Sequence, residues 1–221
     1  MNYSLFAFDF SMSKPALCTY VNNKIDFYCF PMNLDDKSII KLEDVNVKVY
    51  NRGLNSIDKK NFNSNSLVLE HIKRANELSE MILKVILDIV DKNNIDKENV
   101  IIASEGLSFA SKGDAMLDLS GYKYVLLSKL YSQGFTNIKT YSPISIKSVA
   151  GCAKKGEKGK LPMITKIMEE KTNIHNFIDC LKYSPDELKK KTAFVNCVDD
   201  LVDAYWCLKT TIEKENLYIS L

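Results

Sequence analysis

The sequence is poor in the residues that build zinc sites. Among its 221 residues there are only two histidines, His71 and His175, and the six cysteines include no paired CxxC spacing. Structural zinc sites take four Cys or His ligands, which usually occur in such short pairs. We therefore interpret the cysteines as buried free thiols.

Long hydrophobic runs are also absent. Hydrophobic residues make up 46% of the chain, but the apolar segments are short and interrupted by Lys and Asp, as in residues 81–90. None approaches the roughly 20 apolar residues of a membrane span. The N-terminus, MNYSLFAFDF, lacks the basic stretch and small-residue cleavage site of a signal peptide. We expect a cytoplasmic protein without a membrane partner.

The net charge favours no particular partner, because 30 basic residues nearly balance 28 acidic ones. One segment is locally basic: residues 147–160 contain five Lys and a single acid, Glu157, and are punctuated by Gly. Such a segment is suited to contacts with phosphate, although a solvated loop explains it equally well.

The hydrophobic pattern predicts a mixed α/β protein. Strands are expected at residues 3–9, 16–21, 25–30, 100–103 and 137–141, with a short extended piece at 45–50. Helices are expected at residues 66–90, 114–132, 145–150, 161–171 and 198–214. The length favours a single domain over residues 1–221, with an insertion at about 32–66 and an extra segment at about 173–194. A hairpin followed by alternating helices and strands predicts a sheet flanked by helices.

Acidic residues stand at the ends of three elements that are distant in the sequence. Asp9 and Glu105 each end an apolar strand, where a charge is costly unless something pairs with it. In the last helix Asp200 and Asp203 are three residues apart and face one side. Each acid also has a structural explanation: Asp9 could cap the turn at Ser11, Glu105 could pair with a lysine, and the helical acids could favour a helix N-terminus.

Taken together, these acids predict a metal centre. Clustered carboxylates without enough basic partners repel one another, which implies divalent cations with oxygen ligands, most naturally Mg²⁺ or Mn²⁺. Two such ions about 4 Å apart can activate a water and stabilise the leaving oxygen in phosphodiester hydrolysis. The sequence therefore predicts a metal-dependent nuclease, and leaves open whether Asp199 joins the site.

Four segments stand out in order along the chain, namely LFAFDFSMSKPALCTYV, IIASEGLSFASKGDAMLDLSGYKYVLLSKL, YSPISIKSVAGCAKKGEKGKLPMI and VDDLVDAYWCLKT. Together they resemble the RuvC-type Holliday-junction resolvases of the ribonuclease-H-like superfamily. Any one of them would be weak, but chance does not readily explain all four in the right order. The resemblance implies an α/β fold with a mixed five-stranded sheet, whose first three strands are antiparallel and which is flanked by helices on both faces.

The resemblance also implies roles for individual residues. Two Mg²⁺ ions, for which Mn²⁺ can substitute, would be bound by Asp9, Glu105, Asp200 and Asp203. Lys158 would lie near the scissile phosphate as a further catalytic residue. Contacts with DNA would come from Lys147, Lys154, Lys155 and Lys160. Phe109 would insert between bases at the junction centre, although a place in the core explains it as well.

The implied function is a homodimeric endonuclease that cuts four-way junctions and related branched DNA. Two-fold symmetry suits this substrate, because two identical sites can cut two strands of like polarity. The helix at residues 66–90 is a candidate dimer surface, although core packing explains its apolar stripe equally well. Phe10 follows Asp9 where the family usually has a glycine, and this departure fits a divergent phage or viral branch.

Three other functions stay open at this point. The same chemistry could act on an RNA–DNA hybrid or on flap and Y-shaped DNA. The chain could instead bind branched DNA without catalysis, with the acids in structural roles. A sugar-kinase-like ATPase shares the superfamily fold, but the sequence lacks Gly-rich phosphate loops.

Overall fold

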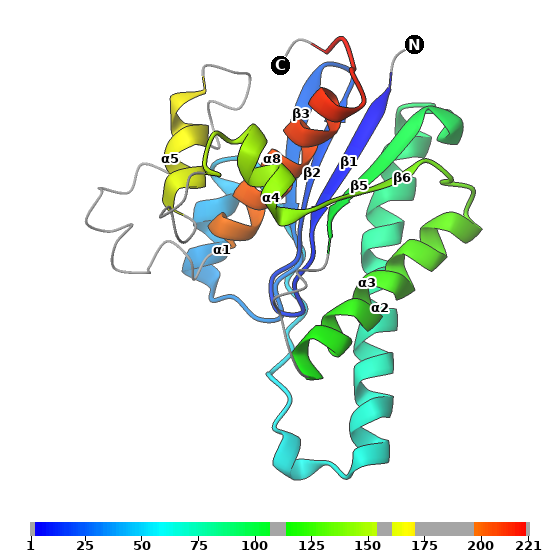
Figure 1. Cartoon of the computed structure of the whole chain (residues 1–221). Coiled ribbons are helices and arrows are strands. Elements are labelled where there is room, and N and C mark those ends of the chain that lie inside the picture. Colours follow the sequence, from blue (N-terminus) through cyan, green and yellow to red (C-terminus); the bar gives the residue numbers. More distant parts are fainter. Residues whose placement is uncertain (1–2, 107–113, 154–160, 171–196, 220–221) are drawn as a thin grey trace.

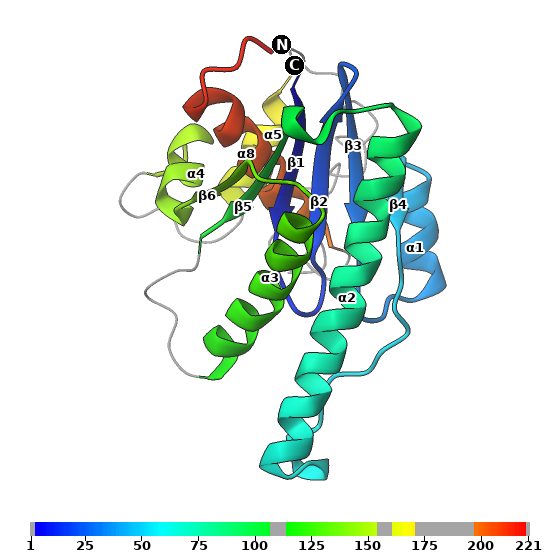
Figure 2. The same cartoon turned by 90° about the vertical axis from the view of Figure 1, so that its right-hand side faces the viewer.

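A mixed six-stranded sheet forms the centre of the molecule, with helices on both of its faces (Figures 1 and 2). The computed structural model describes residues 3–106, 114–153, 161–170 and 197–219. The strand order is β4-β3-β2-β1-β5-β6. The strands are β1 (Ser4–Asp9), β2 (Ala16–Val21), β3 (Lys24–Cys29), β4 (Val47–Val49), β5 (Val100–Glu105) and β6 (Ile138–Tyr141).

The strand directions confirm the predicted fold class. Strands β1, β2 and β3 pair in antiparallel fashion, whereas β5 pairs in parallel with β1, and β6 with β5. This is the mixed sheet with an antiparallel start that the ribonuclease-H-like resemblance implies. The predicted number of five strands is wrong, because β4 adds a sixth strand at the edge, parallel to β3.

The extra strand lies within the segment expected to be an insertion. Val47 is buried opposite Phe27 of β3, so the extended piece predicted at residues 45–50 belongs to the sheet. Helix α1 (Asp36–Glu43) precedes it, with Asp35 as its N-cap, and the short helix η1 (Lys59–Asn61) follows it. The polar composition of residues 32–66 concealed the helix, and it concealed that the extended piece joins the sheet, because only scattered apolar side chains such as Leu42 anchor this segment.

The central strand β1 is buried on both sides. Leu5 and Ala7 face one apolar cluster, while Phe6 and Phe8 face a second cluster on the opposite side. Successive side chains of a strand point to opposite faces, and a strand covered on both faces reads as a continuous apolar run. The apolar run near the start of the sequence, which forms β1, therefore lies at the core of the sheet.

One face is covered by two long helices, α2 (Ser64–Lys92) and α3 (Asp114–Ser132). The C-terminal half of α2 packs on the sheet through Leu78, Ile82 and Ile86, whereas its N-terminal half extends beyond the sheet (Figures 1 and 2). Among the described residues, no helix combines the length and the apolar character that crossing a membrane requires.

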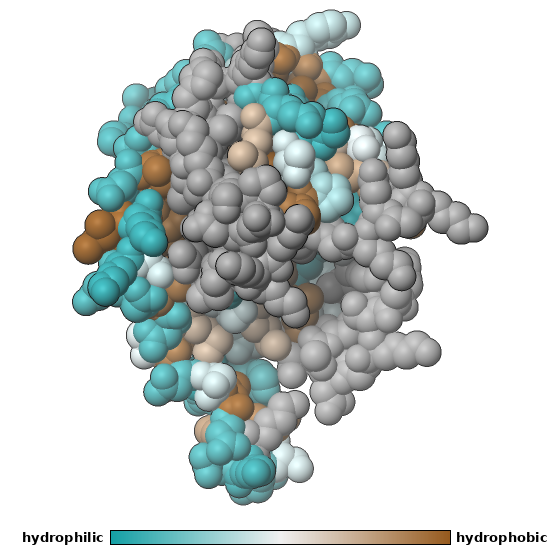
Figure 3. Space-filling model, turned by 90° about the vertical axis from the view of Figure 1, so that its left-hand side faces the viewer, coloured by the Kyte–Doolittle hydropathy of each residue, from teal (hydrophilic) through white to brown (hydrophobic). Residues whose placement is uncertain are grey.

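The opposite face is covered mainly by helix α8 (Val198–Lys214), beside α4 (Pro143–Val149) and α5 (Leu161–Glu169). The indole Nε1 of Trp206 donates a hydrogen bond to the Met163 carbonyl at 3.0 Å, and the Tyr205 hydroxyl donates one to Glu170 at 2.6 Å. These bonds tie α8 to α5. On the side of the molecule that carries α1, hydrophilic and hydrophobic residues alternate over the described surface (Figure 3).

The cysteine interpretation agrees with the structure where it can be compared. Five cysteines are free and buried, namely Cys18, Cys29, Cys152, Cys197 and Cys207. Cys180 lies outside the described residues.

Removing a buried side chain from α2 should destabilise the whole fold. Ile82 is 0% exposed against the sheet, so Ile82→Ala should lower the free energy of unfolding by about 2–5 kcal/mol in chemical denaturation. The same change at Ile144, which is 75% exposed, should alter it by less than about 0.5 kcal/mol. Equal losses in the two variants would contradict this packing.

Candidate metal centre

Strand alternation places Asp9 and Glu105 on the same face of the sheet. In β1, Asp9 continues the row of Leu5 and Ala7, which faces α8. In β5, Glu105 continues the row of Ile101 and Ala103 toward the same cluster. The parallel register pairs Phe8 with Ser104, so the next residue of each strand, Asp9 and Glu105, leaves the sheet at the same level. Two carboxylates distant in sequence thus become neighbours.

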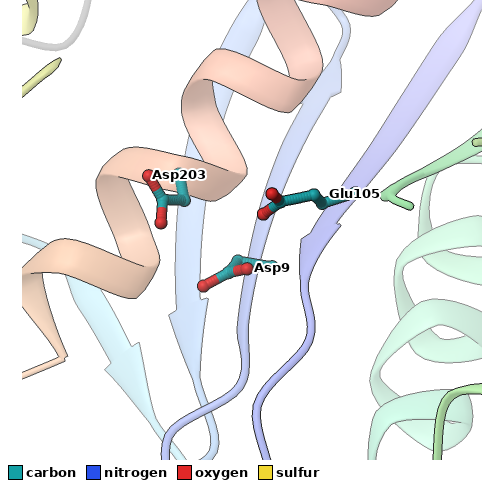
Figure 4. A group of neighbouring side chains, drawn as sticks. All are labelled: Asp9, Glu105 and Asp203. Atoms are coloured by element: carbon teal, nitrogen blue, oxygen red, sulfur yellow. The ribbon is translucent and has the colours of Figure 1, made fainter. Parts of the chain in front are cut away.

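The third carboxylate comes from α8, which packs across these strands. Asp203 is only 4% exposed and Asp9 is 9% exposed, while Glu105 is partly buried. One carboxylate oxygen from each of Asp9, Glu105 and Asp203 lies within 4.8 Å of the others. Figure 4 shows the three side chains converging between the ends of the strands and the helix.

The donor set fits a hard divalent cation. All three groups offer carboxylate oxygens, the ligands that Mg²⁺ and Mn²⁺ prefer. Packing carboxylates this closely within a protein costs several kcal/mol per ion unless positive charge compensates them. The geometry and the burial therefore suit these residues to holding metal ions.

Asp200, the fourth predicted ligand, lies one turn before Asp203 on α8 but outside this close group. Burial, and after it the negative charges of Asp9 and Asp199, together raise the pKa of its carboxyl to about 9. Asp200 is thus near enough to Asp9 to respond to its charge. Asp199 precedes Asp200 in the chain, and its side chain forms a hydrogen bond with the Asp200 side chain.

The end of β5 is held in place at the peptide group between Glu105 and Gly106, where both the N–H and the carbonyl have a partner. The Gly106 N–H donates to the Tyr141 carbonyl at 2.6 Å. A Cβ at Gly106 would meet Thr140 and the Tyr141 carbonyl at 3.2 Å, so this close approach favours glycine. From α3, the Lys123 ammonium donates to the Glu105 carbonyl at 2.6 Å.

Lys123 was missed as a site residue in the sequence. A pattern could have revealed it, because Lys123 falls within the apolar stripe of α3 that includes Tyr122, Leu126 and Leu130. A lysine in such a stripe is rarely buried without a partner.

The predicted DNA-binding residues are only partly described. Lys147 lies in the last turn of α4, a helix that contacts α8. The other basic residues Lys154, Lys155, Lys158 and Lys160, and the aromatic residue Phe109, lie outside the described residues.

No protein-family model and no curated protein matches this chain. Thermus thermophilus RuvC in complex with a Holliday junction substrate has a TM-score of 0.44 at 8% identity, and the likeness covers 96% of both chains. A second Thermus thermophilus RuvC structure has a TM-score of 0.43 at 9% identity, again over 96% of both chains. Similarity at this level carries no inference about the function of this chain.

The raised pKa of Asp200 predicts how the stability of the metal-free protein changes with pH. An unfolded Asp has a pKa of about 4, whereas burial and then the charge of Asp9 raise the folded value to about 9. Between these values the folded state holds one more proton than the unfolded state. The free energy of unfolding should therefore decrease as the pH rises.

Thermal denaturation in a chelating buffer would measure this effect from about pH 5 to about pH 8. Asp200→Asn should flatten the slope of Tm against pH, and Asp88→Asn, on the exposed surface of α2, should leave it unchanged. A wild-type Tm that is constant or rises over this range would contradict the assignment.

Proposed function

We propose that the protein is a metal-dependent endonuclease of the ribonuclease-H-like class that cuts four-way junctions and related branched DNA. The observation that carries the proposal is the convergence of Asp9, Glu105 and Asp203 from two strands and a helix to within 4.8 Å. In this proposal residues 1–221 act as one nuclease domain.

The chain's own residues have distinct parts in this chemistry. Asp9, Glu105 and Asp203, with Asp200 beside them, would hold two Mg²⁺ ions, for which Mn²⁺ can substitute. When bound, such ions activate a water and stabilise the leaving oxygen of a phosphodiester. Asp9 and Glu105 are fixed by adjacent strands and Asp203 by α8, so little side-chain ordering is needed when ions bind.

Branched DNA as the substrate is supported by the four sequence segments that resemble RuvC-type resolvases. In the proposal Lys147, on α4, contacts backbone phosphate, and Lys158 lies near the scissile phosphate. The neighbouring lysines Lys154, Lys155 and Lys160 extend this basic path, and Phe109 inserts at the junction centre. Basic side chains near a nuclease site attract DNA through its phosphates, independently of sequence.

A homodimer is part of the same proposal, with the N-terminal half of α2 as its contact surface. The apolar stripe of α2 is buried on the sheet in its C-terminal half, but Val68, Leu69 and Ile72 in its N-terminal half are exposed. Beside them lies an apolar pocket of about 220 Å³ between α2 and α3, lined in part by Tyr122 and Val125. Exposed apolar side chains next to an apolar pocket suit an isologous contact.

Cleavage of a synthetic four-way junction tests the function directly. The purified protein with Mg²⁺ should cut the junction. Asp9→Asn should lower the rate by about a hundredfold or more, because losing a metal ligand costs about 3 kcal/mol of transition-state stabilisation. Asp36→Asn, on the exposed first turn of α1, is the matched control and should retain full activity.

The alternatives give different results in the same assay. Preferred cleavage of an RNA–DNA hybrid or a flap would change the substrate but keep the chemistry. Junction binding without cleavage by the wild-type protein would favour a non-catalytic role, and an intact junction beside a working nuclease control would refute the proposal.

The dimer prediction has its own test. The double variant Leu69→Glu, Ile72→Glu should be monomeric in light scattering at micromolar concentration, where the wild type should be a dimer, because charges would be buried in the contact. Ile40→Glu, at an exposed position on α1, should remain dimeric. A monomeric wild type, or a dimeric double variant, would show that this surface is not the interface.

A further inference from the structure

A buried lysine lies at the edge of the candidate metal centre. Lys123 is 4% exposed, and it is the one buried Lys or Arg in the part of the chain that the structure describes. It belongs to α3, on the face of the sheet opposite α8. Its ammonium donates to the Glu105 carbonyl at 2.6 Å, at the point where β5 ends.

Burying an ammonium against a neutral carbonyl is costly unless negative charge is near. Burial lowers the pKa of the Lys123 ammonium, and the negative charge of the Glu105 side chain acts in the opposite direction. On α8, the buried thiol of Cys207 lies within electrostatic reach of Glu105, Asp9 and Lys123. The ammonium and the acids therefore share one poorly solvated region.

We propose that Lys123 is a positioning residue of the metal centre that also acts as its built-in counter-charge. Its ammonium holds the end of β5 so that Glu105 faces Asp9 and Asp203, and it offsets the repulsion between these carboxylates before metal ions bind. This inference rests on the proposed function, since it presupposes that the carboxylates bind metal.

The two effects of the charge have opposite signs. Without metal, the ammonium stabilises the assembled carboxylates. When divalent cations bind, the same positive charge repels them and weakens their affinity. A neutral residue at position 123 should therefore destabilise the metal-free protein and tighten metal binding, whereas a residue with only a structural role would not tighten it.

Calorimetric titration of the full chain with Mg²⁺ alone separates charge from hydrogen bonding. Lys123→Gln keeps a donor for the Glu105 carbonyl but removes the charge, and should lower the Mg²⁺ Kd by roughly three- to tenfold. Lys123→Arg keeps the charge and should change the Kd by less than about twofold. Thermal denaturation should show a lower Tm for Lys123→Gln than for wild type without metal, and a smaller difference with saturating Mg²⁺.

The failures of the two proposals are distinguishable. If the wild type binds Mg²⁺ while Lys123→Gln binds it equally or more weakly, the inference is overturned and the nuclease proposal stands. If Lys123→Gln folds only when Mg²⁺ is added, the metal has replaced the missing charge and the inference is supported. If this variant stays unfolded with or without Mg²⁺, Lys123 is only structural and the inference fails. A wild type that binds no Mg²⁺ would overturn both proposals.

Discussion

Mutual repulsion of carboxylates held together at the end of a sheet is the constraint on which this structure depends. Asp9, Glu105 and Asp203 bring oxygens within 4.8 Å of one another, two of them on buried residues. Desolvation and like charge both oppose this arrangement. The arrangement persists because several contacts hold the backbone around it in place. Strands β1 and β5 are in register and α8 lies across both. Lys123 and Gly106 fix the end of β5 by hydrogen bonds.

The apolar layers provide that rigidity. On one face, Leu5 and Ala7 pack under α8, while Phe6 and Phe8 pack under α2 and α3 on the other. Shifting β1 by one residue against its neighbours would exchange these two rows and carry Asp9 to the wrong face. The hydrophobic pattern that makes the sheet stable therefore also selects the face on which the carboxylates meet. The same register of β1 is therefore required both for the stability of the core and for the geometry of the site.

Local patterns were enough to predict the strands that carry the acids, because β1, β5 and the long helices have apolar repeats of the correct period. They were not enough for α1, or to show that the extended piece at residues 45–50 joins the sheet as β4, because few anchoring side chains lie in this polar segment. The buried position of Lys123 was not predicted, because a lysine on a helix is usually solvated. Only its place within an apolar stripe indicates that it is buried. The spacing of Asp200 and Asp203 puts both on one side of α8, and it therefore predicted both as ligands.

The sequence by itself determined that acids end two apolar strands and open the last helix, since these positions follow from local periodicity. Only the tertiary structure decided which of them meet. The parallel register of β1 and β5 sets Asp9 beside Glu105, and the packing of α8 brings Asp203 close to both. The tertiary structure also brings Lys123 of α3, on the face of the sheet opposite α8, into contact with the Glu105 carbonyl. The physical reason is that register and packing depth arise from contacts between elements distant in the chain, which no local pattern contains.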